Sequence, residues 1–311
     1  MDGNIHRLSS GLWASILGHA HPHVNARVKA AIDRGITFAS TTELEIEAAE
    51  RIAATGMEQV RLSNSGSEAT MSALRIALRP HGPRKFIKFE GNYHDNYDYV
   101  MFGEPYPGRA HGSTPKTTAS RPPRACLGPC ATIWSLCPTT ILRRSAQPWP
   151  ITGHSLPPFF VEPIMGNVAG ITPLAGWLER IRERCDHYGV VLIFDEVKTG
   201  FRLANGGAQN YFGVRADLAT LCKALGNDFP VSAIAGKAEI MAVVEPGRVA
   251  QGGTYCGNAV AAAAVCGTLE YLEAHPVIES IFARGRELMD GLHAILNRAS
   301  VSTSYWRAGH V

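Results

Sequence analysis

The sequence has 311 residues, enough to bury a large core, and its 45% hydrophobic and 18% charged residues are typical of a globular protein. A formal net charge of +3, with lysines and arginines scattered along the chain, argues against nucleic acid, and no apolar run approaches the length of a membrane span. Seven widely spread cysteines and an N-terminus without signal-peptide order lead us to expect reduced thiols and a cytoplasmic location.

Helix and strand patterns alternate along most of the chain. A helical pattern of apolar residues covers 26–54, and another helix follows the polar turn 63–68 and is stopped by Pro80. Two more helices are expected at 174–187 and 257–271. Short apolar runs typical of buried strands lie at 86–89, 159–161, 190–194, 218–222 and 231–235. The alternation predicts an α/β fold with a largely parallel sheet.

The window 121–158 does not fit this pattern. It contains no Asp or Glu but has eight prolines and three of the seven cysteines, and it shows no helical or strand period. Two readings remain open: an unstructured insertion, or residues translated from the wrong frame or from a retained intron. We favour mistranslation because normal patterning resumes abruptly at Phe159. No metal site is expected, since the cysteines lack a histidine at zinc-site spacing.

Two residues that could carry chemistry end apolar runs. Asp195 closes the run 190–195, and Lys223 closes the run 217–223, so each would reach the rim of a sheet. A pyridoxal phosphate (PLP) enzyme needs such a pair: the amine forms a Schiff base with the cofactor aldehyde, and the carboxylate keeps a proton on the pyridine nitrogen. Taken singly, each residue also has an ordinary reading at the protein surface. Lys198 and Lys237 are rival lysines, ranked lower because neither directly follows a strand pattern.

A phosphate site is suggested at the start of the helix that follows residue 65. Ser65-Gly66-Ser67 places hydroxyl and backbone donors where unpaired N–H groups and the helix dipole converge. Alone this signal is weak, because Ser and Asn cap ordinary helices. Tyr93 follows a predicted strand and could stack on a cofactor ring or pack in the core. The glycine-rich segment 252–258 could supply another phosphate ligand.

Taken together, these segments resemble the class III PLP-dependent aminotransferases, and among them look most like the glutamate-1-semialdehyde 2,1-aminomutase branch. The resemblance covers about 4–120 and 159–298, with the motifs in family order. The matching motifs are Ile16-Leu-Gly-His-Ala-His-Pro22, Asn64-Ser-Gly-Ser-Glu-Ala69, Asn92-Tyr-His94, Val161-Glu-Pro-Ile-Met-Gly-Asn167, Asp195-Glu-Val-Lys-Thr-Gly-Phe-Arg202, Asp217-Leu-Ala-Thr-Leu-Cys-Lys223 and Gly253-Thr-Tyr-Cys-Gly-Asn258.

The resemblance implies a role for each matching position. Lys223 would be the Schiff-base lysine and Asp195 the partner of the pyridine nitrogen. Tyr93 would stack on one face of the ring and Val197 would lie against the other. The remaining cofactor contacts would come from Ser65, Gly66 and Ser67 at the phosphate, Glu162 and Asn167 near the phenolic oxygen and the lysine, and Thr254, which would reach the phosphate of the neighbouring subunit.

The resemblance also implies a fold and an assembly. The fold would be PLP-dependent transferase fold type I, like aspartate aminotransferase, with a mixed, mostly parallel sheet in the large domain. We expect an N-terminal remnant at 1–40, a PLP-binding large domain at 41–275 and the start of an incomplete small domain at 276–311. The chain would be truncated at both ends relative to the family. A complete protein would form a homodimer.

One departure falls inside a motif, because the family pattern Tyr-His-Gly is Tyr93-His94-Asp95 here. We expect a PLP-dependent aminotransferase that acts on an amino acid or another small-molecule amine. Two alternatives stay open: a 2,1-aminomutase of the glutamate-1-semialdehyde type, and a catalytically inactive truncated product. The sequence does not identify the amino donor or acceptor.

Overall fold

The computed structural model describes residues 13–78, 86–89, 91–101, 134–136, 157–168, 170–245 and 248–298. Among the helices in these ranges, none is both long enough and apolar enough to cross a membrane.

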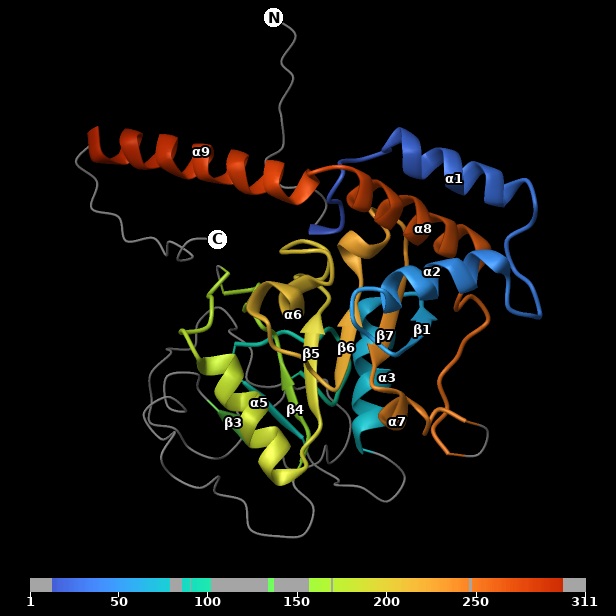
Figure 1. Cartoon of the computed structure of the whole chain (residues 1–311), viewed down its shortest axis with the longest axis horizontal. Coiled ribbons are helices and arrows are strands. Elements are labelled where there is room, and N and C mark those ends of the chain that lie inside the picture. The colour runs from blue at the N-terminus through green and yellow to red at the C-terminus, as the bar shows by residue number, and fades with distance from the viewer. Residues whose placement is uncertain are drawn as a thin grey trace, which may run out of the picture.

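The fold is built on one seven-stranded sheet (Figure 1). Its strands are β1 (Gln59–Ser63), β2 (Ile87–Phe89), β3 (Trp134–Leu136), β4 (Phe159–Val161), β5 (Leu192–Glu196), β6 (Leu218–Leu221) and β7 (Ser232–Gly236). They lie side by side in the order β1-β7-β6-β5-β4-β2-β3. β7 runs antiparallel to both neighbours, and every other pair is parallel. The expected α/β fold with a mixed, mostly parallel sheet is confirmed.

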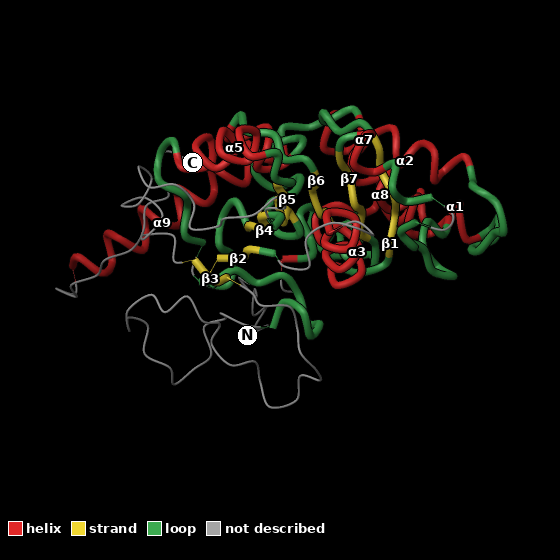
Figure 2. Tube along the Cα trace, turned by 90° about the horizontal axis from the view of Figure 1, so that it is seen from below, coloured by secondary structure: helices red, strands yellow, loops and turns green. Residues whose placement is uncertain are grey.

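Helices cover both faces of the sheet, and Figure 2 shows α3 on one face and α5 on the other. The helices are α1 (Pro22–Ile32), α2 (Glu43–Ala53), α3 (Gly66–Leu78), α5 (Trp177–Tyr188), α6 (Gly207–Phe212), the 3-10 turn η2 (Lys223–Leu225), α7 (Ala238–Met241), α8 (Ala259–Ala274) and α9 (Val277–Arg298). α2 and α8 pack together on the part of the sheet formed by β1, β6 and β7. The sheet is therefore a buried middle layer.

The two faces of β5 show how the sequence directs side chains. Leu192 and Phe194 pack in the cluster that includes α5, whereas Ile193 packs in the cluster that includes α3. Since side chains alternate along a strand, Asp195 faces the α3 side. The whole strand is buried, so this carboxylate is delivered into the interior rather than into solvent.

All five strands predicted from the sequence are present; 159–161 matches β4 at both ends, and the other four differ by at most two residues at either end. The predicted helix 26–54 is instead two helices, α1 and α2, separated by a turn in which Gly35 has a φ of 110°. β1 was missed because only continuous apolar runs were interpreted as strands, whereas β1 alternates polar and apolar residues as a partly exposed strand does. β3 was missed because three residues show no period. β3 lies inside the window 121–158; apart from it and Pro157 and Pro158, that window lies outside the described residues.

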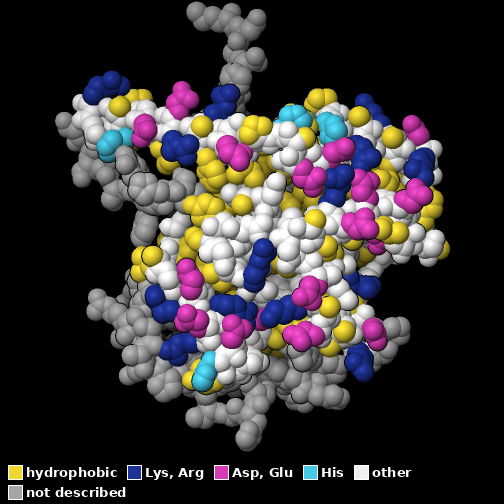
Figure 3. All heavy atoms as spheres, viewed as in Figure 1, with side chains coloured by type: hydrophobic (Ala, Val, Ile, Leu, Met, Phe, Trp, Pro, Cys, Tyr) yellow, Lys and Arg dark blue, Asp and Glu magenta, His cyan; other side chains and the backbone are white. Residues whose placement is uncertain are grey.

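The C-terminal helix α9 projects from the body of the molecule (Figure 1). None of its residues is buried, although it carries large apolar side chains such as Leu288, Leu292 and Ile295. Figure 3 shows hydrophobic side chains at the surface of this projecting part. The expected domain boundaries at residues 41 and 276 stay predictions.

Candidate active site

Neighbouring parallel strands bring Asp195 and Thr220 together. The two residues are paired in register across β5 and β6. The Thr220 hydroxyl donates to Asp195 Oδ1 at 3.0 Å, and the Val197 backbone N–H donates to the same oxygen at 3.1 Å. Asp195 is only 3% exposed, so these bonds stabilise a carboxylate that water cannot reach freely.

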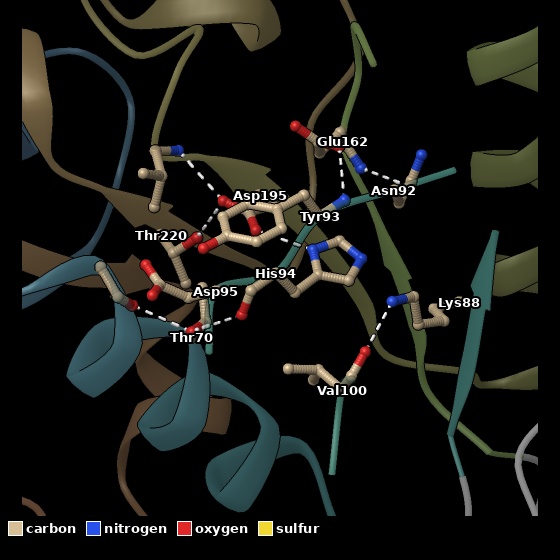
Figure 4. Close-up of polar contacts among 12 residues, drawn as sticks. Thr70, Lys88, Asn92, Tyr93, His94, Asp95, Val100, Glu162, Asp195 and Thr220 are labelled. Carbon is tan, nitrogen blue, oxygen red and sulfur yellow. Dashed lines mark hydrogen bonds and ion pairs between the residues drawn. The ribbon is translucent and has the colours of Figure 1, made fainter. Parts of the chain in front are cut away.

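His94 completes the surroundings of Asp195 (Figure 4). Its Nδ1 lies 2.7 Å from Asp195 Oδ2, and its ring stacks on Phe160 with centroids 3.9 Å apart. Its backbone carbonyl accepts a hydrogen bond of 3.1 Å from the Thr70 hydroxyl. Burial lowers the pKa of His94, although the hydrogen bond and the charge of Asp195 oppose this effect. The Asp195 carboxylate is thus held in one orientation by His94, Thr220 and the Val197 N–H.

A small pocket joins this carboxylate to Lys223. Lys223 opens η2 directly after β6 and has a left-handed backbone with a φ of 48°. The pocket contains about 210 Å³ not filled by protein atoms, part of it open to solvent. The lining residues are Thr70, Tyr93, Asp95, Glu162, Asp195, Val197, Lys198 and Lys223.

Glu162 forms a second buried carboxylate beside the pocket. Its Oε2 accepts from the Tyr93 backbone N–H at 2.8 Å, and its own N–H donates to Asn92 Oδ1 at 2.9 Å (Figure 4). Burial, and then the negative charge of Asp195, raise the pKa of Glu162 to about 7. Glu162 can therefore hold or release a proton near neutral pH.

Lys198, the rival lysine, lies in the same pocket. Its Nζ is 4.0 Å from Glu162 Oε1, donates to Asn167 Oδ1, and lies 5.6 Å from the centre of the Tyr93 ring. Burial lowers the pKa of Lys198, although the Glu162 charge opposes this effect. Lys237 is a different case, because it pairs with Asp217 at 2.6 Å and does not line the pocket. The structure thus leaves two lysines near Asp195.

The predicted phosphate cradle lies at the N-terminus of α3, beside the pocket. The Ser65 hydroxyl accepts from the Glu68 N–H at 3.3 Å, which is ordinary helix capping. A Cβ on Gly66 would meet Val197 Cγ1 at 3.4 Å and Asp95 Oδ2 at 2.6 Å. The Ser67 hydroxyl donates to Asp95 Oδ1 at 2.5 Å. The space next to Gly66 is therefore too narrow for a side chain, because the Asp95 carboxylate lies against the first turn of α3.

Five of the predicted cofactor residues are not part of the pocket lining: Ser65, Gly66 and Ser67 at the start of α3, and Asn167 and Thr254. Asn167 is exposed and borders the pocket only through Lys198. Thr254 is exposed in the segment before α8, and the nearby Asn64 amide bonds to Cys256 Sγ at 3.5 Å. Neither position contradicts the role that the resemblance implies, and both roles stay predictions.

Five residues of the site were not assigned roles from the sequence. His94 and Thr220 hold Asp195, and Thr70, Asp95 and Lys198 line the pocket. Thr220 could have been found from the alternation within the strand 218–222, which places it two residues after the buried Leu218. The positions of His94, Asp95 and Lys198 depend on loop geometry, for which the sequence carries no periodic signal.

The residues present fit a PLP cofactor at most positions. A buried carboxylate partnered by His94 can keep a proton on a pyridine nitrogen, and Lys223 and the apolar Val197 line the same pocket. Asp95, which lies against Gly66 and Ser67, does not suit a phosphate. A mixed α/β sheet with a lysine and a carboxylate at one pocket is the arrangement expected of a PLP-dependent transferase of fold type I.

The chain belongs to the class III aminotransferase family, whose model, described as "Aminotransferase class-III", matches residues 3–307. It is 38% identical over 318 residues to the glutamate-1-semialdehyde 2,1-aminomutase of Rhodopirellula baltica, covering 99% of this chain and 70% of that protein. Three predictions from the sequence are thereby confirmed at the level of the family: this family itself, a PLP-dependent aminotransferase, and pyridoxal phosphate as the cofactor.

Solved structures show the same fold. The chain is similar to a structure described as a transaminase with PLP bound, with a TM-score of 0.78 and 28% identity, covering 94% of this chain and 68% of that one. It is also similar to an omega-transaminase from Sphaerobacter thermophilus, with a TM-score of 0.77 and 30% identity over the same shares of the two chains. The expected fold type I is thereby confirmed.

Proposed function

We propose that this chain moves an amino group between a small-molecule amine or amino acid and a carbonyl acceptor, with PLP held by Lys223. The observation that carries the proposal is the pocket itself. Its lining includes both Lys223 and an Asp195 carboxylate that His94 and Thr220 hold in place.

Each of these residues would have its own task in the reaction. When bound, PLP supplies the electron sink that weakens the Cα–H bond of an attached amine. Asp195 Oδ would hold a proton on the ring nitrogen, and Val197 and Tyr93 would orient the ring between them. Lys223 Nζ would first hold the cofactor covalently and then, once displaced by substrate, take the proton from the substrate Cα. Glu162 would hold a proton near Lys223, which suits its pKa of about 7.

The phosphate would bind at Ser65, Gly66 and Ser67, where the helix dipole of α3 favours an anion. Thr254 would contact the phosphate of a second copy, which makes a homodimer part of the proposal. The exposure of Thr254 and of the adjacent Tyr255, which is 63% exposed, supports this assignment. A cytoplasmic location is also proposed, and the free thiols of Cys185, Cys222, Cys256 and Cys266 support it.

The test follows the cofactor's visible absorbance. Protein loaded with PLP should lose the band of the lysine-bound cofactor when an amino donor is added and regain it with a carbonyl acceptor. Lys223→Ala should abolish both changes. The matched control is Lys198→Ala, which removes the other lysine of the pocket and should keep them. A wild-type protein that binds PLP but never responds to amines would overturn the proposal and favour an inactive product.

Aminomutase activity is the second candidate, favoured by the Rhodopirellula baltica relative. Such an enzyme moves the amine within one substrate and needs no separate acceptor. Incubation with an amino-aldehyde alone, followed by separation of the isomers, distinguishes the two activities. Isomer formation without an added keto acid would support the aminomutase.

A further inference from the structure

Asp95 is placed unusually for a residue of a cofactor pocket. Its backbone is left-handed, with a φ of 78°, a conformation that Asp tolerates better than most residues. One carboxylate oxygen, Oδ1, accepts from the Ser67 hydroxyl at 2.5 Å and from the Asn96 N–H at 3.0 Å. Oδ2 lies 2.6 Å from the position of a Cβ on Gly66. The carboxylate is thus fixed over the first turn of α3.

This is the place where the proposed function puts the cofactor phosphate. The first N–H groups of a helix have no partner within the helix, and an anion there is favoured by the dipole. In this chain the anion is an aspartate side chain. A phosphate bound at Gly66 and Ser67 would meet a second negative charge and would compete for the Ser67 hydroxyl.

We propose that Asp95 acts as a built-in anion that occupies the phosphate cradle and must turn away before the cofactor phosphate binds. The inference rests on the proposed function, since it assigns the phosphate to this cradle. It makes Asp95 a positioning residue that sets how tightly the chain holds phosphorylated cofactor. Asp95 is also one of the residues that line the pocket.

The experiment compares two ligands that differ only in the phosphate. The affinities of PLP and of pyridoxal, which lacks the phosphate, are measured by absorbance titration on wild type, Asp95→Gly and Asp95→Asn. Glycine suits the left-handed backbone, so the Gly variant should fold. Asp95→Gly should bind PLP at least about tenfold more tightly and pyridoxal within about twofold of wild type, because removing a nearby like charge favours only the anionic ligand. The PLP affinity of Asp95→Asn should lie between those of wild type and Asp95→Gly.

Two further readouts separate this role from a merely structural one. Inorganic phosphate should raise the melting temperature of cofactor-free Asp95→Gly and leave that of wild type almost unchanged. Asp98→Asn makes the same change of charge in the same loop, outside the pocket lining, and should leave the PLP affinity unchanged.

Unchanged PLP affinity in Asp95→Gly would overturn the inference, and so would an equal gain for PLP and pyridoxal. Failure of the proposed function gives a different result, in which neither wild type nor Asp95→Gly forms a lysine-bound cofactor at any PLP concentration.

Discussion

The two ends of the pocket are built in different ways. At the Asp195 end the carboxylate is buried and is held by the His94 ring, the Val197 N–H and the Thr220 hydroxyl. At the α3 end the Asp95 carboxylate is half-buried and lies where an anionic ligand is expected. If the cofactor binds as we propose, the Asp195 carboxylate already has fixed hydrogen-bond partners at the ring-nitrogen end, whereas Asp95 would have to move at the phosphate end.

Asp195→Ala tests the organised end and should have the largest effect. Transamination should fall by about 100-fold or more, because an oriented charge at the reacting group is lost. The free energy of unfolding should also fall by about 1–3 kcal/mol, since His94 and Thr220 lose a buried partner. Turnover and urea unfolding measure the two effects. Thr220→Val removes one donor only and should cost clearly less; an equal loss in both variants would contradict the account.

Glu162 gives the organised end a dependence on pH. Because its pKa is raised from 4.5 to about 7, its contribution to stability is complete below about pH 4.5 and is lost as the pH rises through 7. Between pH 5 and pH 8, cofactor-free wild type should lose about 1–3 kcal/mol of stability relative to Glu162→Gln. Glu196, whose burial raises its pKa to about 6, is present in both proteins and cancels. Urea unfolding measures both proteins across this range. A difference in unfolding free energy that does not change with pH would refute the raised pKa of Glu162.

Gly66→Ala tests how closely Asp95 approaches the cradle. The added Cβ would lie 2.6 Å from Asp95 Oδ2, so crowding should cost about 1–2 kcal/mol. In an Asp95→Gly background this cost should fall by about 1 kcal/mol, since the obstructing carboxylate is gone. Thermal or urea unfolding of the four proteins gives the coupling. Strictly additive costs would mean that Asp95 does not occupy the cradle.

The sequence predicted the parts of this site that depend on regular structure. Apolar runs that end in Asp195 and Lys223 placed both residues at strand ends, and both line the pocket. Register and loop conformation carry no such signal. The pairing of Asp195 with Thr220 depends on how two strands align, and the approach of Asp95 to Ser67 depends on a left-handed residue in a loop. Lys198 was ranked below Lys223 because it does not directly follow a strand pattern in the sequence. Its side chain nevertheless reaches the pocket from the turn after β5.

The most direct test asks which lysine holds the cofactor. Protein loaded with PLP is treated with borohydride, which fixes the link between lysine and cofactor, and the labelled peptide is identified by mass spectrometry. The account predicts the added mass on Lys223 in wild type and in Lys198→Ala, and no fixed cofactor in Lys223→Ala. Label on Lys198 of the wild-type protein would contradict it.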